Sequence, residues 1–397
     1  MPQSPAIAAT NAVSLRQAIA ALTVGSVALL ILGLQPLLLG ELVAHQSVSL
    51  TGVGLVAMGE IIALGLGVIV GNTMLSPGRL SGVTVVAGIL LALLDLVTMR
   101  LNGDATFILV RALAGLVEGV LVWVTTSIIV RTAAPERLAA IYLVVQTLAQ
   151  AAVAALLAAV VIPKAGWPGG FATLAALSAA LVAIAPALGP RLQRLDPEGS
   201  GRLPRSAATV VTFAVILGQM GALGALWAYL DPLGRGAGLN ATQVGMLISA
   251  VLVLQVLGGS TAALVVRRLG ARAVLIVASL LLVGLSLGLG DRPSALLFCA
   301  LSGAFGFVWM FLMPFQIRLA FDADPAGRVA VLVPALQLLG VAFGPLLASI
   351  FFVTQDDAHC VPRVCTGFAF VALCLLLASR RCFGTKELIQ YQSGEES

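Results

Sequence analysis

Long apolar runs, interrupted by short polar segments, set the pattern of this chain from end to end. Within the runs the apolar residues are continuous rather than alternating, which favours membrane helices over the strands of a transmembrane barrel. A helix of about 20 apolar residues crosses the hydrocarbon core of a bilayer. The sequence therefore predicts an all-α membrane protein with twelve transmembrane helices. Their expected ranges are 18–40, 50–73, 80–101, 105–130, 138–162, 169–189, 207–230, 242–265, 272–289, 293–319, 328–353 and 364–380.

The composition agrees with a chain whose main solvent is lipid. Hydrophobic residues make up 60% of the 397 residues and charged residues only 10%, whereas soluble proteins carry about 25% charged residues. The first apolar run is too long for the apolar core of a secretory signal peptide and lacks a small-residue cleavage site, so we interpret it as the first membrane helix.

The basic residues predict the orientation of the chain. With the N-terminus in the cytoplasm, 16 of the 22 Lys and Arg residues fall in cytoplasmic segments, 5 fall outside, and Arg111 lies within a helix. Cytoplasmic loops of membrane proteins carry this excess. We therefore expect a multi-pass protein of the bacterial inner membrane with both termini in the cytoplasm. The net charge of +5 then reflects orientation, and no basic patch or module predicts binding to nucleic acid.

Two related halves are the next prediction. A Pro-, Gly- and charge-rich segment at 191–206 is typical of a cytoplasmic linker. It separates an N-terminal six-helix bundle at 1–190 from a C-terminal six-helix bundle at 207–397. The halves match at a constant offset of 191 residues. The matching pairs are Val53 and Val244, Gly54 and Gly245, Gly67 and Gly258, Arg137 and Arg328, and Gln146 and Gln337.

These features, with three local motifs, resemble the major facilitator superfamily of transporters. The segment from Arg111 through Gly115 to Gly119 is similar to the RxxxGxxxG motif of the superfamily's fourth helix. The loop after the second helix keeps Gly71, Gly78 and Arg79 of a longer motif but lacks its acidic residue, and the corresponding loop of the second half keeps more of it. The basic residues of these loops are candidates for gating or structural roles, and they are Arg79, Arg267, Arg268 and Arg272.

The resemblance implies two pseudo-symmetric six-helix bundles around a central cavity that opens alternately to each side. It also places the helices that contain Pro36 and Pro314 along that cavity. Gly115 and Gly119 have the small-residue spacing that permits close helix contact, so packing is their expected role. The resemblance names no substrate.

Ionisable residues placed inside the hydrocarbon, away from the ends of the predicted helices, occur only in the first half, and they are Glu60, Asp95, Arg111 and Glu118. Such groups are costly in hydrocarbon and usually functional. Glu60 and Glu118 both fall near mid-membrane at about 1.5 Å of rise per residue. We predict that one or both carries a proton. The alternative is a static, ion-paired carboxylate.

Arg111 has three possible roles. It can attract an anionic group of a substrate, because its planar donor fork suits carboxylate or phosphate. It can switch between carboxylates, or it can form a structural pair with Asp95 at a similar depth. Arg111 and Glu118 lie seven residues apart, on one helix face and about 10 Å apart along the axis.

Neutral polar and aromatic residues in the helices are further candidates for contact with a solute. Glutamine amides bind polar groups without a net charge, although they also bond helices to one another. For the symmetric pair of Gln146 and Gln337 we favour helix bonding or gating. The remaining candidates for substrate binding are Gln35, Gln219, Trp123 and Trp309.

Cys360 and Cys365 fall in one predicted outer loop, where oxidising conditions permit a short disulfide. Two unpaired thiols are the alternative. No phosphate-binding loop, catalytic triad or metal-ligand pattern stands out, so we expect no enzyme activity, cofactor or metal site.

The sequence as a whole predicts a secondary transporter that moves a small organic solute, anionic or polar, by alternating access. Coupling to protons is part of this prediction, and we expect the chain to work as a monomer in the lipid bilayer. An efflux pump for apolar, drug-like compounds is the first alternative. A membrane sensor that keeps the fold without transport is the second.

Overall fold

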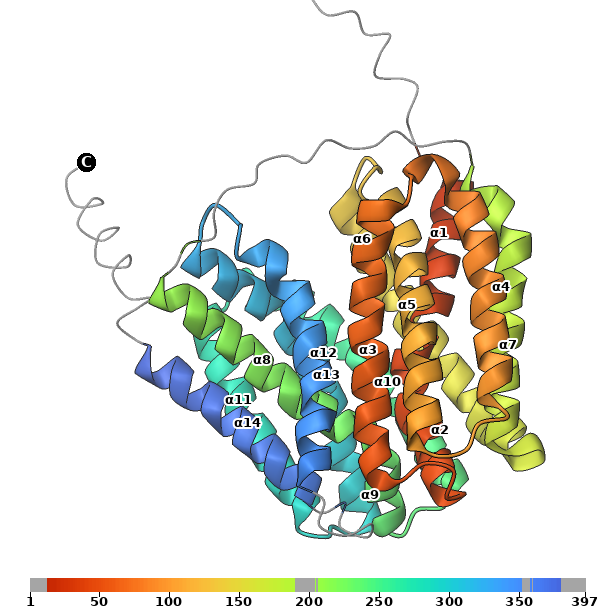
Figure 1. Ribbon diagram of the computed structural model, residues 1–397. Helices are drawn as coiled ribbons and strands as arrows, with labels where there is room; N and C mark the ends of the chain where they lie inside the picture. Colours follow the sequence, from red (N-terminus) through yellow and green to blue (C-terminus); the bar gives the residue numbers. More distant parts are fainter. Residues whose placement is uncertain (1–12, 190–203, 205, 352–357, 359, 380–397) are drawn as a thin grey trace, which may run out of the picture. The chain divides into compact units, whose positions relative to one another are not determined.

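A computed structural model describes residues 13–189, 204, 206–351, 358 and 360–379, and its regular secondary structure is helical throughout these residues (Figure 1). The α-helices are α1 (Leu15–Ala28), α2 (Leu30–Ala44), α3 (Leu50–Met74), α4 (Leu80–Thr98), α5 (Asp104–Ile129), α6 (Pro135–Leu156), α7 (Ile162–Ile184), α8 (Ala207–Ala228), α9 (Leu230–Gly236), α10 (Ala241–Val265), α11 (Ala271–Gly290), α12 (Ala295–Ala323), α13 (Val333–Ile350) and α14 (Cys360–Ala378).

Eleven helical stretches in the described residues are long and apolar enough to cross a membrane. Ten of them coincide with one expected span each. The eleventh, Arg137–Leu188, is 52 residues long and covers both the fifth and the sixth expected spans. Its helix is interrupted at Gly166, which has φ 64° and ψ −169°. A side chain other than glycine rarely adopts this backbone conformation.

The chain divides into two compact units. The first comprises Met1–Gly52, Gly59–Pro197 and Ala241–Leu252, and the second comprises Val53–Met58, Glu198–Asn240 and Val253–Ser397. Each unit thus takes most of one expected half, and α3 and α10 contribute to both. The expected linker at 191–206 lies outside the described residues, apart from positions 204 and 206.

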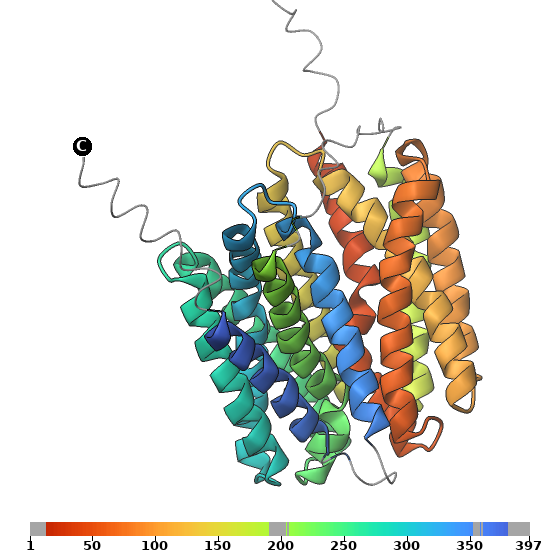
Figure 2. The same ribbon diagram turned by 60° about the vertical axis from the view of Figure 1, so that its left-hand side comes forward.

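Within the first unit, α4 packs against α5 and α7, while α1 packs against α5 and α6 (Figures 1 and 2). One hydrophobic cluster of this unit collects side chains from α1, α4, α5 and α7, including Val24, Leu91, Trp123 and Leu181. Within the second unit, α8 packs against α13 and α14, and α11 packs against α12 and α14. Each unit therefore has a buried interior of its own in which polar side chains can be held.

The helix boundaries follow the sequence repeat. Helix α10 begins and ends 191 residues after α3, and α11 and α12 begin 191 residues after α4 and α5. The offset of 191 residues between matching single residues is thus also an offset between whole helices.

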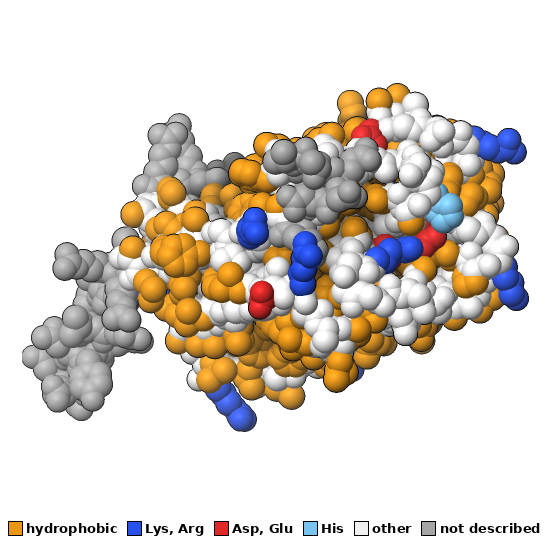
Figure 3. All heavy atoms as spheres, turned by 90° about the horizontal axis from the view of Figure 1, so that it is seen from below, with side chains coloured by type: hydrophobic (Ala, Val, Ile, Leu, Met, Phe, Trp, Pro, Cys, Tyr) orange, Lys and Arg blue, Asp and Glu red, His pale blue; other side chains and the backbone are white. Residues whose placement is uncertain are grey.

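Large hydrophobic side chains cover much of the surface. Leu109, Leu264 and Leu296 are 62%, 77% and 83% exposed. Seen from the lower end of Figure 1, hydrophobic side chains surround a few scattered charges (Figure 3). Such a surface is suited to contact with lipid rather than water.

The sequence left a disulfide and two thiols as alternatives for Cys360 and Cys365. In the described part of the chain no disulfide joins them, and both belong to α14. Five residues along a helix separate two side chains by about 7.5 Å of rise and about 140° of rotation. This separation exceeds what a disulfide spans.

The turn between α12 and α13 contains a pH-sensitive ion pair. The carboxylate of Asp324 accepts hydrogen bonds from Nη2 of Arg328 at 2.9 Å and from Nε and the backbone N–H of Arg328 at 3.0 Å each. These bonds lower the pKa of Asp324 from 3.8 to about 2. A carboxyl group whose pKa is lower in the folded state stabilises the fold above its unfolded pKa. This contribution is lost as the pH falls from 3.8 towards 2.

We therefore expect wild-type protein to lose thermal stability between about pH 5 and about pH 2.5 more steeply than the Arg328→Gln variant. Unfolding temperatures in detergent at the two pH values provide the measurement. Arg268→Gln, on a neighbouring loop, is the control and should keep the wild-type slope. Equal slopes for wild type and Arg328→Gln would show that the pair does not stabilise the folded state.

Candidate functional site

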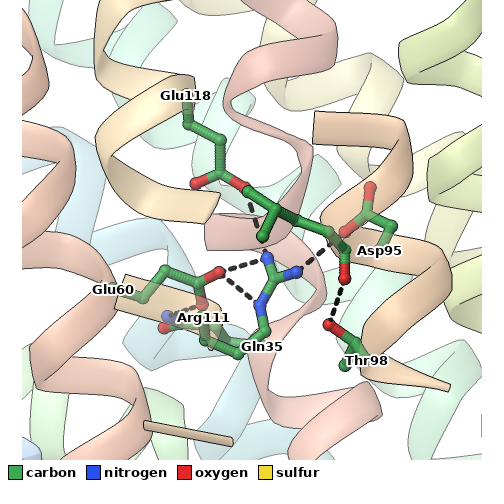
Figure 4. A network of polar contacts seen from close by, with 7 residues as sticks. Gln35, Glu60, Asp95, Thr98, Arg111 and Glu118 are labelled. Atoms are coloured by element: carbon green, nitrogen blue, oxygen red, sulfur yellow. Dashed lines mark hydrogen bonds and ion pairs between the residues drawn. The ribbon is translucent and has the colours of Figure 1, made fainter. Parts of the chain in front are cut away.

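A single arginine surrounded by three carboxylates forms the most polar site in the first unit (Figure 4). Nη1 of Arg111 donates to Oδ1 of Asp95 at 2.7 Å, and Nε donates to Oε1 of Glu60 at 2.7 Å. Nη2 donates to the same oxygen of Glu60 and, at 3.2 Å, to Oε1 of Glu118. Arg111 is only 1% exposed, and its guanidinium lies over the ring of Phe171 at 5.4 Å.

The three carboxylates differ in how well their negative charge is compensated. Glu60 also accepts from Nε2 of Gln35 at 3.2 Å, so both of its oxygens have donors. Asp95 has a second hydrogen bond, with the side chain of Ser178. Glu118 has only its 3.2 Å contact with Arg111, and its Oε2 is buried with no hydrogen-bond partner among the described residues.

Close contact between α3 and α5 brings these groups together. The backbone of α5 at Gly115 and Gly119 lies directly against the backbone of α3. A Cβ on Gly115 would be 2.2 Å from the carbonyl oxygen of Glu60, and a Cβ on Gly119 would be 2.0 Å from that of Leu64. At the helix starts, Asp104 of α5 accepts from the backbone N–H and the hydroxyl of Ser49, at 2.8 and 2.5 Å. The small-residue motif of the sequence thus sets the distance at which Glu60 contacts Arg111.

Replacing Gly119 with alanine should destabilise the first unit by about 3 kcal/mol, because the added methyl group meets backbone atoms that cannot turn away. Thermal unfolding in detergent measures the change. Gly65→Ala on α3 is the matched control, since a Cβ there meets nothing within 4 Å. A Gly119→Ala protein as stable as Gly65→Ala would contradict the close approach of the two helices.

The charges of the cluster do not balance if all of its groups are ionised. Three carboxylates around one guanidinium leave a net charge of −2 in the interior of a membrane protein. Burying uncompensated charge is very costly, and a carboxyl group avoids that cost by binding a proton. Glu118, whose ionised form has the fewest donors, is the group best suited to do so.

The second unit holds an uncharged counterpart. Nε2 of Gln337 on α13 donates to Oε1 of Gln316 on α12 at 2.8 Å, and Nε2 of Gln316 donates to Oε1 of Gln219 on α8 at 2.9 Å. Gln219 in turn donates to the hydroxyl of Ser279 at 2.9 Å and to the carbonyl oxygen of Leu275 at 3.2 Å, both on α11. This chain of amide hydrogen bonds joins α8, α11, α12 and α13. Gln219 and Gln337 therefore have a structural role in the second unit.

The two tryptophan candidates lie in different surroundings. Trp123 is 4% exposed within the hydrophobic cluster of the first unit and packs against Gly71. Trp309 is partly exposed and meets the rings of Trp227 and Phe305 edge-on, each at 5.8 Å. Trp309 is therefore the better candidate for contact with a solute.

The basic loop residues lie at helix ends. Arg272, in the first turn of α11, donates from Nε and Nη2 to the carbonyl oxygen of Leu376 in the last turn of α14. Arg79 is the N-cap residue of α4, and Arg267 and Arg268 follow the end of α10. Arg318 of α12, which belongs to none of the loop motifs, donates to the carbonyl oxygens of Val266 and Leu269 in this same loop. Arginines bonded to the carbonyl ends of helices stabilise those ends.

Comparison with solved structures identifies the fold. The nucleoside transporter NupG matches with a TM-score of 0.70 at 14% identity, over 93% of this chain and 100% of NupG. The xylose transporter XylE from E. coli, in a partially occluded inward-open conformation, matches with a TM-score of 0.65 at 13% identity, over 94% and 99% of the two chains. The chain has the major facilitator fold.

A bacterial homologue of the human lysosomal transporter Spinster, inward-facing and unoccupied, has the same fold, with a TM-score of 0.68 at 12% identity over 92% of this chain and 97% of the homologue. No protein-family model matches the chain, and no curated protein does. The major facilitator fold is therefore recognisable in three dimensions, whereas the sequence has diverged beyond such comparisons. Among the described residues, no group of His, Cys, Asp and Glu side chains is arranged to hold a metal ion.

Sequence reasoning found the members of the charged cluster but not its arrangement. It left a pair of Arg111 with Asp95 as one of three possible roles and placed Glu118 about 10 Å from Arg111 along the axis, whereas the side chain of Arg111 contacts both carboxylates directly. The contact with Glu60 depends on how closely α3 approaches α5. The glycine spacing of Gly115 and Gly119 is the signal that pointed to this approach.

Proposed function

We propose that the protein is a secondary transporter that moves a small polar organic solute across the bacterial inner membrane by alternating access, coupled to protons. The observation that carries the proposal is the buried cluster of Arg111 with Glu60, Asp95 and Glu118, in which three carboxylates share one cation. A buried site with this charge imbalance binds a proton in one conformation and releases it when water or solute changes its surroundings.

The transport cycle follows from competition for the guanidinium. With Glu118 protonated, Arg111 is balanced by Glu60 and Asp95. When Glu118 loses its proton, its carboxylate competes with Glu60 for Nη2 of Arg111 and weakens the ion pair that joins α3 to α5. This is the second of the roles predicted for Arg111, switching between carboxylates. Direct attraction of an anionic solute is less favoured, because carboxylates already occupy the donors of Arg111.

The topology belongs to the same proposal. We propose twelve membrane crossings in two six-helix halves, 1–190 and 207–397, with both termini in the cytoplasm and with the chain acting as a monomer. A continuous helix of 52 residues would be about 78 Å long, more than twice the hydrocarbon thickness of about 30 Å. The break at Gly166 supports two crossings by Arg137–Leu188.

The first experiment identifies the solute. Thermal-shift screening of the purified protein against a metabolite library selects compounds that raise its unfolding temperature, because ligands stabilise the state that binds them. Each selected compound is then added to proteoliposomes that contain a trapped pH-sensitive dye. A solute-dependent proton flux is expected. Solute movement without any proton flux would contradict the coupling, and neither binding nor movement of any compound would favour a sensor.

A further inference from the structure

Two glutamines at equivalent positions of the repeat have different surroundings. Gln337 donates its amide to Gln316 and so belongs to the amide chain of the second unit. Gln146, 191 residues earlier, has a buried Oε1 that meets no donor among the described residues. The repeat therefore places one glutamine in a helix-to-helix bond and leaves the other with an unsatisfied acceptor. A buried carbonyl oxygen without a donor is costly, so the amide oxygen of Gln146 is suited to accept a hydrogen bond from a ligand.

Other unsatisfied polar atoms lie in the same unit as Gln146. Tyr142, one turn earlier on the same face of α6, is 7% exposed, and its hydroxyl is buried without a hydrogen bond in the described residues. Ser26 of α1 is 6% exposed and has an unpartnered hydroxyl, and Oε2 of Glu118 is the fourth such atom. With the hydroxyl of Thr84 on α4, the described residues of this unit hold five such atoms. Buried polar side chains are nearly always bonded, so this number is unusual.

The helix contacts place these atoms at one level of the first unit. Gln150 of α6 donates to the carbonyl oxygen of Leu29 at 2.6 Å, and a Cβ on Gly25 would be 2.5 Å from the hydroxyl of Tyr142. Gln146, halfway between Tyr142 and Gln150, therefore lies near Leu29, where α1 ends and α2 begins.

The level of Glu118 follows in the same way. The hydroxyl of Thr125 on α5 donates to the carbonyl oxygen of Ala21 on α1 at 2.9 Å. Glu118 lies two turns before Thr125, about 10 Å along the axis, which is the level of Ala28. Glu118 of α5 and Gln146 of α6 thus both lie at the level where α1 ends and α2 begins.

We infer that Ser26, Glu118, Tyr142 and Gln146 form a binding site for a solute group that carries N–H or O–H donors and is uncharged or cationic. The amide and carboxylate oxygens accept hydrogen bonds, and the two hydroxyls accept or donate. The carboxylates of the neighbouring cluster outnumber its single cation, so the site repels anions. This inference rests on the proposed transport function and narrows its substrate to donor-bearing, non-anionic solutes.

Charged thiol reagents of similar size test the site without knowledge of the natural solute. The five native cysteines are replaced by serine, and Gln146→Cys and Gln337→Cys are introduced separately. Each purified protein is treated with cationic 2-aminoethyl methanethiosulfonate or with anionic 2-sulfonatoethyl methanethiosulfonate. Rates are divided by the rate of the same reagent with free 2-mercaptoethanol, which removes intrinsic reactivity. A size-exclusion profile confirms that each variant is folded.

We expect Gln146→Cys to react at least about tenfold faster with the cationic reagent than with the anionic one. With Glu118 protonated, the negative charge of the cluster comes from Glu60 and Asp95 against one arginine. Adding Asp95→Asn should therefore remove most of that preference, and Gln337→Cys should react slowly with both reagents. An unreactive Gln146→Cys, or one without charge preference, would overturn the site. So would a Gln337→Cys that behaves like Gln146→Cys. Because no proton gradient or solute flux is involved, failure here is distinguishable from failure of proton coupling in proteoliposomes.

Discussion

Replacing Arg111 with glutamine should destabilise the protein more than any other single change in the charged cluster. Among the described residues, Arg111 is the one cation that contacts Glu60, Asp95 and Glu118, and the substitution leaves these three buried carboxyl groups without it. Removing one partner of a buried ion pair costs about 3–5 kcal/mol. We expect a large fall in unfolding temperature in detergent and very low recovery of folded protein from membranes.

A compensating variant distinguishes charge imbalance from lost packing. Arg111→Gln combined with Glu60→Gln and Asp95→Asn removes the unpaired charges along with the cation, so it should regain a substantial part of the lost stability. If the triple variant were no more stable than Arg111→Gln alone, the contacts of the guanidinium with Phe171 and the helix walls, rather than its charge, would account for its effect.

Replacing Glu118 with glutamine should abolish proton coupling while leaving the protein folded. The amide has nearly the shape of the protonated carboxyl group, and Arg111 keeps Glu60 and Asp95 as partners. The variant should still exchange labelled solute for unlabelled solute across a proteoliposome membrane. Accumulation driven by a pH gradient should fall by about tenfold or more, because no titrating group remains at that position.

Glu60→Gln is the matched comparison, because it also removes one buried carboxylate from the cluster. Glu60 accepts from Arg111 and from Gln35, so this variant should lose stability as well as transport. Proton-driven accumulation that survives in Glu118→Gln but is lost in Glu60→Gln would transfer the proton-carrying role to Glu60. Proton-driven accumulation by a variant with both Glu60→Gln and Glu118→Gln would contradict the proposal that either residue carries the proton.

Hydropathy predicted the helices well because burial in lipid leaves a strong and simple signal. The ends of α3, α10 and α11 fall within a few residues of the expected spans. The break at Gly166 lies in the connection expected at 163–168 between the fifth and sixth spans, although the residues around it remain apolar and helical.

The site was harder to predict because its contacts depend on the distance between helices. Sequence spacing gave the shared face of Arg111 and Glu118, and depth offered the pairing of Arg111 with Asp95 as one of three alternatives. The hydrogen bonds that join Gln219, Gln316 and Gln337 link residues up to 97 positions apart, and no local pattern indicates them. The different surroundings of Gln146 and Gln337 are likewise invisible in a repeat that makes them equivalent.

The most direct test of proton storage is the infrared absorption of carboxyl groups in purified protein at neutral pH. A protonated carboxyl group absorbs separately from carboxylates and amides. We predict that wild-type protein shows this absorption, that its position shifts in heavy water, and that Glu118→Gln lacks it. The same absorption in Glu118→Gln, or none in wild type, would contradict a proton held at Glu118.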